Sequence, residues 1–180
     1  MATMMNSVDV VRDARPEDAE ALCRAAQDIA RTHDERFVSS PEELQPAAFQ
    51  DRITAALTGS GKYLVIEREE QLIAHASFLP MRMKRLAHVF SLDMCVHLGY
   101  WRQGHGQRLL SNLLHWARIE PGVHKIELLV RATNQAAITL YEQAGFVEEG
   151  RYRDRIKLQD GRFVDDIAMA VILKAPPRSG

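Results

Sequence analysis

Hydrophobic residues recur with two different periods along the chain, and the changes of period separate predicted helices from predicted strands. Apolar positions follow helical spacing over residues 16–31, 47–57 and 106–120. A fourth helix is predicted over residues 134–144 and is closed by Gly145, at the position that favours a left-handed residue. The prolines and the missing period of residues 33–46 indicate a loop or a broken helix.

Shorter apolar or alternating runs predict the strands. These runs cover residues 8–13, 63–67, 72–79, 88–96, 126–130, 146–155 and 163–173. The turn Gln159-Asp-Gly161 is the strongest hairpin signal. Residues 126–130 are almost continuously apolar, which is typical of a strand that is covered on both faces.

Length and composition favour one globular domain. The 180 residues are 46% hydrophobic and 26% charged, which allows one sizeable core and excludes general disorder. The order of elements predicts a single α+β domain with a mixed sheet over residues 8–175, with polar tails at 1–7 and 176–180. A formal net charge of −1 gives the chain no overall charge for binding nucleic acid or an anionic membrane, so neither partner is expected.

The cysteines and the chain start favour a reducing compartment. Cys23 and Cys95 lie far apart and form neither a disulfide framework nor a zinc pattern. Residues 1–7 are too few and too polar for the apolar core of a signal peptide, and no stretch approaches the roughly 18 apolar residues of a membrane span. We therefore expect a cytoplasmic protein.

Residues 96–110, VHLGYWRQGHGQRLL, carry the most chemical information, because a strand leads through a glycine-containing loop into a helix. Gly104 and Gly106 allow close approach of the backbone to a ligand. Unpaired N–H groups in the first helical turn form an anion site, and a diphosphate is its common occupant. The segment matches neither of two common nucleotide-binding motifs. A Walker A loop would need Gly-Lys-Ser/Thr at its end, and a dinucleotide fingerprint would need a third glycine where Leu109 stands. A tight turn without a ligand is the alternative.

Two segments resemble a known family. The segment YWRQGHGQRLL over residues 100–110 is similar to the acetyl-CoA signature of the GNAT superfamily of N-acetyltransferases, which reads Gln or Arg, two residues, Gly, one residue, Gly or Ala. Gly104 and Gly106 match, whereas Trp101 stands at the first position. Residues 128–146, LLVRATNQAAITLYEQAGF, resemble the family's strand, Asn, helix, Tyr and Gly-Phe segment, in the family's order and spacing.

The resemblance implies a fold, a reaction and a cofactor site. The implied fold is a mixed, mostly antiparallel sheet of about seven strands, splayed in the middle and flanked by about four helices. The implied reaction is direct transfer of the acetyl group of acetyl-CoA to an amine in a ternary complex. Amides of Met94, Cys95 and Val96 would hold the pantetheine arm and the thioester oxygen, and Asn134 would bond to the pantetheine. The diphosphate would be held by Arg102, Gln103, Gly104, His105, Gly106 and Gln107.

By the same resemblance, Tyr141 would contact the cofactor and protonate the departing CoA thiolate. Asn134 and Tyr141 are seven residues apart, which places them on one helix face. A phenol with a pKa of about 10 is a suitable acid for a thiolate whose conjugate acid has a pKa of about 8.5. The alternatives are a helix N-cap for Asn134 and a core aromatic for Tyr141.

The amine must also lose a proton, and Asp93 is the first candidate for the general base. Strand alternation puts Asp93 on a polar face with Ser91 and Cys95. Pairing with an arginine is the alternative for Asp93, and His75 is a weaker candidate base. Cys95 suggests a covalent acyl-enzyme, but no His and Asp arrangement accompanies it in the sequence, so a small buried residue is expected.

No metal site is expected, because His97 and His105 have no partners at ligand spacing. The acceptor implied by the resemblance is an amine of a small molecule or of a protein. Residues 33–46 and the basic turn 82–85 are expected to shape its site, since loops carry specificity. The sequence leaves the oligomeric state undecided, and a homodimer is one alternative. A CoA-binding sensor or scaffold without turnover is the alternative from another functional class.

Overall fold

A seven-stranded mixed sheet forms the centre of the computed structural model, which describes residues 8–36 and 39–174. The strand order is β1-β2-β3-β4-β5-β7-β6, and only the β4–β5 pair is parallel. The strands are β1 (Val10–Asp13), β2 (Lys62–Arg68), β3 (Gln71–Pro80), β4 (Val89–Val96), β5 (Lys125–Arg131), β6 (Val147–Lys157) and β7 (Phe163–Ile172). The predicted sheet is confirmed. The tails predicted at 1–7 and 176–180 lie outside the described residues.

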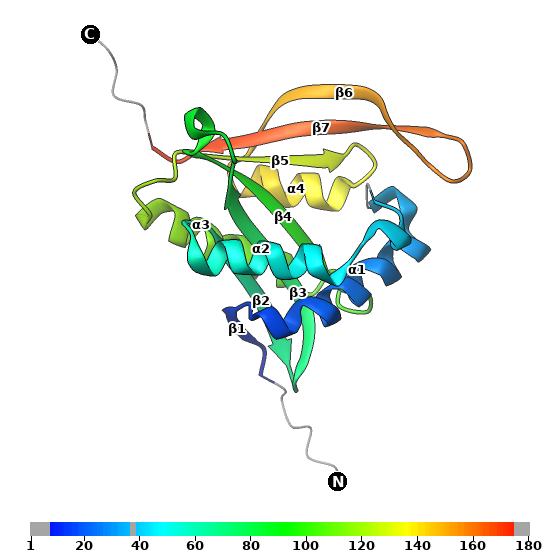
Figure 1. Ribbon diagram of the computed structural model, residues 1–180. Helices are drawn as coiled ribbons and strands as arrows, with labels where there is room; N and C mark the ends of the chain where they lie inside the picture. The colour runs from blue at the N-terminus through cyan, green and yellow to red at the C-terminus, as the bar shows by residue number, and fades with distance from the viewer. Residues whose placement is uncertain (1–7, 37–38, 175–180) are drawn as a thin grey trace.

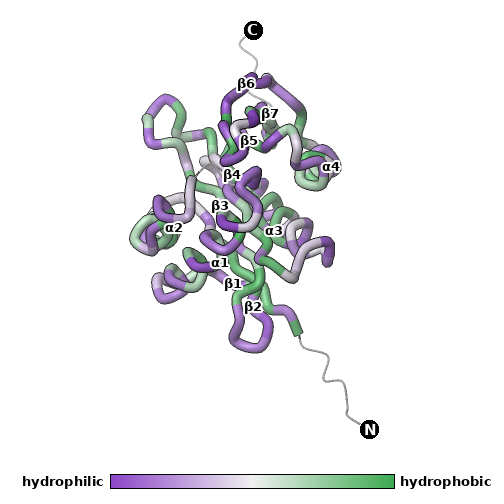
Figure 2. Tube along the Cα trace, turned by 90° about the vertical axis from the view of Figure 1, so that its right-hand side faces the viewer, coloured by the Kyte–Doolittle hydropathy of each residue, from purple (hydrophilic) through white to green (hydrophobic). Residues whose placement is uncertain are grey.

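Helices cover both faces of the sheet (Figures 1 and 2). In the described part of the chain they are α1 (Ala19–Thr32) and α2 (Pro46–Thr58) on one face, and α3 (His105–Ile119) and α4 (Gln135–Gln143) on the other. Short 3₁₀ turns are η1 (Pro16–Asp18), η2 (Asp34–Arg36), η3 (Pro41–Glu43) and η4 (Lys84–Leu86). The predicted break over residues 33–46 therefore holds two of these turns. None of the described helices is long and apolar enough to cross a membrane.

Two hydrophobic clusters form the core, one on each face of the sheet. Side chains alternate along β2, so Leu64 and Ile66 join the larger cluster with α3 and α4, whereas Tyr63 and Val65 join the smaller one with α1 and α2. In Figure 2, strand segments near the middle are largely green and outer turns are largely purple. The apolar periodicity that predicted the elements therefore corresponds to these two buried clusters.

One detail of the predicted sheet is wrong. Residues 126–130 suggested a strand covered on both faces, but Leu129 is 48% exposed. Leu128 and Val130 point into the larger cluster, whereas Leu129 lies on the opposite face. Helix α2 packs against β2 and β3, on the N-terminal half of the sheet. Leu129 instead lines an open cavity.

Phe90 anchors the sheet where β4 joins β5, so its truncation should be costly. It is fully buried, faces Ile126 in the strand register and packs edge-on against Trp116 at a centroid distance of 6.1 Å. We expect Phe90→Ala to lower the free energy of unfolding by about 3–5 kcal/mol. The matched variant Phe163→Ala, at a position 56% exposed, should cost less than about 1 kcal/mol. Urea unfolding measures both, and equal losses would contradict the anchoring role of Phe90.

Candidate functional site

Strands β4 and β5 begin together and then separate. They pair only at Val89, Phe90 and Ser91, which face Lys125 to Glu127. Figure 1 shows the two strands starting side by side and diverging toward their C-terminal ends. A cavity of about 1190 Å³ lies along the separation and is lined by β4, β5, the first turn of α3 and parts of α1, α2 and α4. The implied splay of the sheet is therefore present.

The register of β3 with β4 determines which main-chain groups face the cavity. Hydrogen bonds from His97 N to Ile73 O (2.9 Å) and from Met81 N to Val89 O (2.9 Å) mark bonded pairs at both ends of the ladder. Because bonded and non-bonded pairs alternate, the amide of Cys95 points toward β3. The amides of Met94 and Val96 point the other way, into the separation. Of the three strand amides expected at the ligand, these two have the right orientation.

The N-terminus of α3 closes one end of the cavity. Gly104 caps the helix with φ 83°, a left-handed conformation that glycine adopts without strain. The next three residues, His105, Gly106 and Gln107, lie in the first helical turn, where amides lack helical partners, and all three line the cavity. A Cβ on Gly106 would lie 3.3 Å from Leu140, so glycine keeps this space open. The loop therefore offers a group of main-chain donors with room for an anion.

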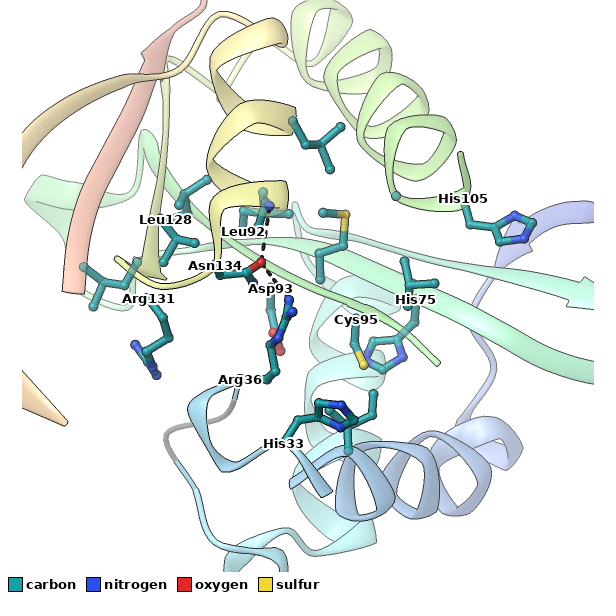
Figure 3. Close-up of a pocket in the computed structure, with 18 of the residues that line it drawn as sticks. His33, Arg36, His75, Leu92, Asp93, Cys95, His105, Leu128, Arg131 and Asn134 are labelled. Atoms are coloured by element: carbon teal, nitrogen blue, oxygen red, sulfur yellow. Dashed lines mark hydrogen bonds between the residues drawn. The ribbon is translucent and has the colours of Figure 1, made fainter. Parts of the chain in front are cut away.

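The side chains predicted to hold the diphosphate have different surroundings. Arg102 lines the cavity and has a positive φ of 60°. Gln103 is absent from the lining, and its side chain donates to Gly99 O at 3.0 Å. The His105 ring points away from the cavity (Figure 3) and lies 3.5 Å from Asp9. Desolvation lowers the pKa of His105. His105 thus contributes its amide to the cavity and its ring to the packing against Asp9.

Trp101 and Arg36 link the end of β4 to the start of α4 across the cavity. The indole Nε1 of Trp101 donates to Val96 O at 2.6 Å. Arg36 lies 5.3 Å from the Trp101 ring centroid and donates to Asn134 Oδ1 at 2.7 Å (Figure 3). The indole of Trp101 therefore satisfies the carbonyl of Val96 at the end of β4. The amide of Val96 stays directed toward the separation.

Asn134 and Tyr141 both line the cavity from α4, as their spacing predicts. Asn134 is also the helix N-cap, since its Oδ1 accepts from Ala137 N at 3.3 Å. That oxygen also binds Arg36, so the amide nitrogen of Asn134 is the group left for a ligand. Tyr141 belongs to the core cluster at 7% exposure. Burial, followed by the nearby Asp93, raises the pKa of Tyr141, so its hydroxyl stays protonated near neutral pH.

Asp93 lies at the end of the cavity lined by α2, which we call the inner end. Its carboxylate is 49% exposed and forms an ion pair with Arg52. Arg52 also stacks on Phe49, with its guanidinium 4.6 Å from the ring centroid. Pairing with an arginine, the alternative role considered for Asp93 from the sequence, is therefore present. The ion pair holds the carboxylate in the cavity lining.

His75, Cys95 and His97 form a buried cluster beside the inner end. His75 is the direct register partner of Cys95 across β3 and β4, and its Nδ1 lies 3.1 Å from His97 Nε2. Burial lowers the pKa of His75 well below the ordinary histidine value and also lowers that of His97. Burial raises the pKa of the Cys95 thiol, which disfavours a thiolate nucleophile. Cys95 is buried, as expected, and strand pairing places beside it a histidine that no arrangement in the sequence indicated.

Comparisons with known proteins agree with this geometry. A family model for the Acetyltransferase (GNAT) family matches residues 20–146. The chain is 42% identical over 79 residues to a ribosomal protein bS18-alanine N-acetyltransferase of Escherichia coli K12, covering 44% of this chain and 52% of that protein. It is 27% identical over 113 residues to the L-amino acid N-acetyltransferase AaaT of the same strain, covering 61% and 67%. The structure of yncA from Salmonella typhimurium with its cofactor acetyl-CoA has a TM-score of 0.85 at 21% identity, covering 97% of this chain and 99% of that chain.

The chain belongs to the GNAT acetyltransferase family. The matched residues include the glycines of the loop, Asn134 and Tyr141. The chain spans about half the length of the first curated relatives that it matches, with 52% of those proteins covered. The likeness to the Salmonella structure, at 21% identity, concerns the fold alone.

Several lining residues of this GNAT cavity carry no signal of their own in the sequence. Arg36 and Arg52 reach the cavity from η2 and α2, and nothing in the local pattern separates them from other surface arginines. The loop segments expected at an acceptor site do contribute, through His33, Arg36 and Arg82. Cys95 and His97 share a strand face by alternation, so that part of the cluster was readable from the sequence. Its third member required the β3–β4 register.

Burial of neutral His75 should make this GNAT protein acid-sensitive. The unfolded chain binds a proton at His75 below about pH 6.5, whereas the folded chain does not, so the free energy of unfolding falls as pH falls. Each such histidine contributes up to about 1.4 kcal/mol per pH unit. His75→Gln should flatten this dependence between about pH 7 and pH 5, and His115→Gln, at an exposed position, is the matched control. Urea unfolding with a chelator present measures the slopes, and an unchanged slope in His75→Gln would mean that folded His75 is charged.

Proposed function

We propose that this protein is an acetyl-CoA-dependent N-acetyltransferase that transfers the acetyl group directly to an amine in a ternary complex. The single observation that carries the proposal is the separation of β4 from β5 beyond Ser91, which leaves strand amides facing a cavity. Family membership supports the reaction class. The named activities of the bacterial relatives, acetylation of a ribosomal protein's alanine and of L-amino acids, support an amine acceptor.

The residues fit acetyl-CoA along the whole cavity. A pantetheine arm contains amides that pair with strand groups, and Met94, Val96 and Asn134 offer such groups. The diphosphate fits the first turn of α3, where the amides from His105 to Gln107 are joined by the side chain of Arg102. Gln103 and the amide of Cys95, both expected here from the family resemblance, are directed elsewhere. The proposed site therefore rests on fewer residues than the motif implies.

Stabilisation of the thioester oxygen falls to the end of β4. Acetyl-CoA supplies an activated carbonyl, on whose oxygen negative charge develops during attack by an amine. Main-chain amides held by a sheet do not reorganise during the reaction, so they stabilise this charge efficiently. Met94 and Val96 present such amides, and the ladder to β3 holds their strand in position. The amine nitrogen forms the new bond to the acetyl carbon as the carbon–sulfur bond breaks.

Tyr141 donates a proton to the departing sulfur in this proposal. Its raised pKa keeps the phenol protonated, and the resulting phenolate returns to the acid form by taking up a proton from solvent. Among the described residues, the hydroxyl oxygen of Tyr63 is buried without a hydrogen-bond partner. The hydroxyl oxygen of Tyr141 is not among such buried, unpaired atoms. Tyr141 is therefore reachable from the cavity that it lines.

Asp93 takes the proton from the amine. It is the carboxylate of β4 at the inner end, where its ion pair with Arg52 of α2 holds it in the cavity lining. His75 is the alternative base in the same region. Its pKa, lowered by burial, makes it a weak proton acceptor, and its Nδ1 is engaged with His97. The position of Asp93 in the cavity lining therefore favours it as the base.

Binding of acetyl-CoA should stabilise the folded protein. At about 100 times its dissociation constant, a ligand of the folded state adds about 2.7 kcal/mol to the free energy of unfolding, which a thermal shift detects. Gly106→Val should abolish the shift, because its side chain would extend toward Leu140 and Met94 in the cleft. Gly122→Val is the matched control, since a Cβ there has no neighbour within 4 Å. Absence of any shift in the parent protein would contradict the proposal.

Tyr141→Phe and Asp93→Asn should separate binding from chemistry. Both variants should retain the acetyl-CoA thermal shift and lose about 10²–10⁴-fold in kcat, because each removes one proton transfer. Thiol release from acetyl-CoA is the measurement, with an alanine-terminated peptide and free L-amino acids as acceptors. The matched controls are Tyr152→Phe and Asp28→Asn, at exposed positions of β6 and α1, and both should keep parental rates.

The outcomes distinguish the candidate functions. Unchanged turnover in either active-site variant would remove that residue from the reaction. Acetyl-CoA binding without thiol release for any amine class would favour a CoA-binding sensor or scaffold. Preference between the peptide and the amino acids assigns the acceptor class.

A further inference from the structure

We propose that His75, Cys95 and His97 form a binding site for one divalent cation of the zinc class. The three side chains are buried, and one donor atom from each lies within 4.8 Å of the others. Figure 3 shows the Cys95 sulfur directed at the His75 ring. No metal was expected from the sequence, because His97 and His105 have no partners at ligand spacing along the chain. The sheet supplies the proximity instead.

Strand geometry places the three donors on rigid backbone. His75 and Cys95 face each other in the β3–β4 ladder, and His97 follows two residues after Cys95 on the same face. The amide of His97 donates to Ile73 O at 2.9 Å, so the ladder continues one residue past the strand end. Metal sites built on paired strands keep their donor positions without a ligand, which lowers the cost of binding.

His97 already makes the outer contact that a ligating histidine needs. Its Nδ1 lies 2.8 Å from Leu72 O. A carbonyl only accepts, so Nδ1 carries the hydrogen and Nε2 carries a lone pair directed at His75. A hydrogen bond from the second ring nitrogen to a backbone carbonyl is the usual way that proteins orient metal-bound histidine.

The donor separations need only small side-chain adjustments to hold zinc. Tetrahedral bonds of about 2.0–2.1 Å to nitrogen and about 2.3 Å to sulfur put neighbouring donors about 3.3–3.6 Å apart. The His75–His97 nitrogens are 3.1 Å apart. A change of tautomer at His75 frees its lone pair toward the ion, and the Cys95 thiol has no hydrogen-bond partner within the described residues that binding would break. Two imidazoles and a thiolate favour zinc-class ions over Mg²⁺ or Ca²⁺.

The cavity gives an ion access to the cluster. His75 and Cys95 line it, so the cavity reaches two of the three donors. The positive charge of Arg52 at this end is paired with Asp93. Tyr63 lies 6.0 Å from His75 between ring centroids, and its buried hydroxyl has no hydrogen-bond partner within residues 8–36 and 39–174. A metal-bound water is a group of the kind that this unsatisfied hydroxyl lacks.

Co²⁺ titration of the full-length, chelator-treated and reduced protein tests the site. A thiolate bound to Co²⁺ gives a strong charge-transfer absorption in the near ultraviolet, and tetrahedral coordination gives visible bands. We expect saturation at one Co²⁺ per chain and loss of the absorption when Zn²⁺ is added. This readout does not depend on acetyl transfer, so failure here and failure of the proposed function are distinguishable.

Variants locate the ion. Cys95→Ser should remove the charge-transfer band, and His97→Gln should weaken Co²⁺ affinity by about 10–100-fold. The matched controls are Cys23→Ser, which changes the other cysteine, and His115→Gln, which changes an exposed histidine. Both controls should bind Co²⁺ like the parent. Circular dichroism and urea unfolding show whether each variant is folded.

Three results would overturn the proposal. One is the absence of charge-transfer absorption in the parent with excess Co²⁺, which decides the question even if a variant fails to fold. Another is loss of the band in Cys23→Ser rather than Cys95→Ser. The third is unchanged Co²⁺ affinity in both Cys95→Ser and His97→Gln, which would place the ion at a surface histidine.

Discussion

The main chain of β4 has a strand on both sides only as far as Ser91, and the rest of the molecule is organised around the edge that this leaves open. Main-chain donors and acceptors in a sheet interior need partners, because leaving them buried and unpaired is costly. Here the open edge faces a cavity, so water or an extended, amide-containing ligand can pair with it. A pantetheine arm is such a ligand. The open edge therefore fits the proposed cofactor through its main chain rather than through a side chain.

Contacts on both sides of the separation keep the strands from closing. At the end of β5, Arg131 forms a buried ion pair with Asp166, its register partner on β7, which holds β5 toward β7. At the end of β4, the Trp101 indole occupies the Val96 carbonyl that a neighbouring strand would otherwise bind. Between the strands, Gly106 brings the α3 N-terminus close to Leu140 of α4. Pairing of β4 with β5 as far as Val96 would therefore displace the indole from the Val96 carbonyl.

The sequence was most informative where a pattern is local. Hydrophobic periodicity predicted the helices and the strands, and Gly104 carries the positive φ that the turn needs. Residues 128–146 carried a family pattern that placed Asn134 and Tyr141 on the cavity. Prediction ended where proximity depends on strand register. The orientation of the Cys95 amide and the proximity of Cys95 to His75 both follow from the pairing of β3 with β4. That pairing joins positions 20 residues apart, which no local pattern encodes.

The inner end of the cavity combines two chemistries that compete for one residue. An ion bound by His75 would occupy the lone pair that His75 would need as a base. Asp93 is free of this conflict, because its partner is Arg52 on α2 rather than a member of the cluster. A proton acceptor tied to α2 and a buried donor cluster tied to the β3–β4 ladder can therefore coexist at the same end of the cavity. The role proposed for Asp93 therefore does not depend on whether the cluster binds an ion.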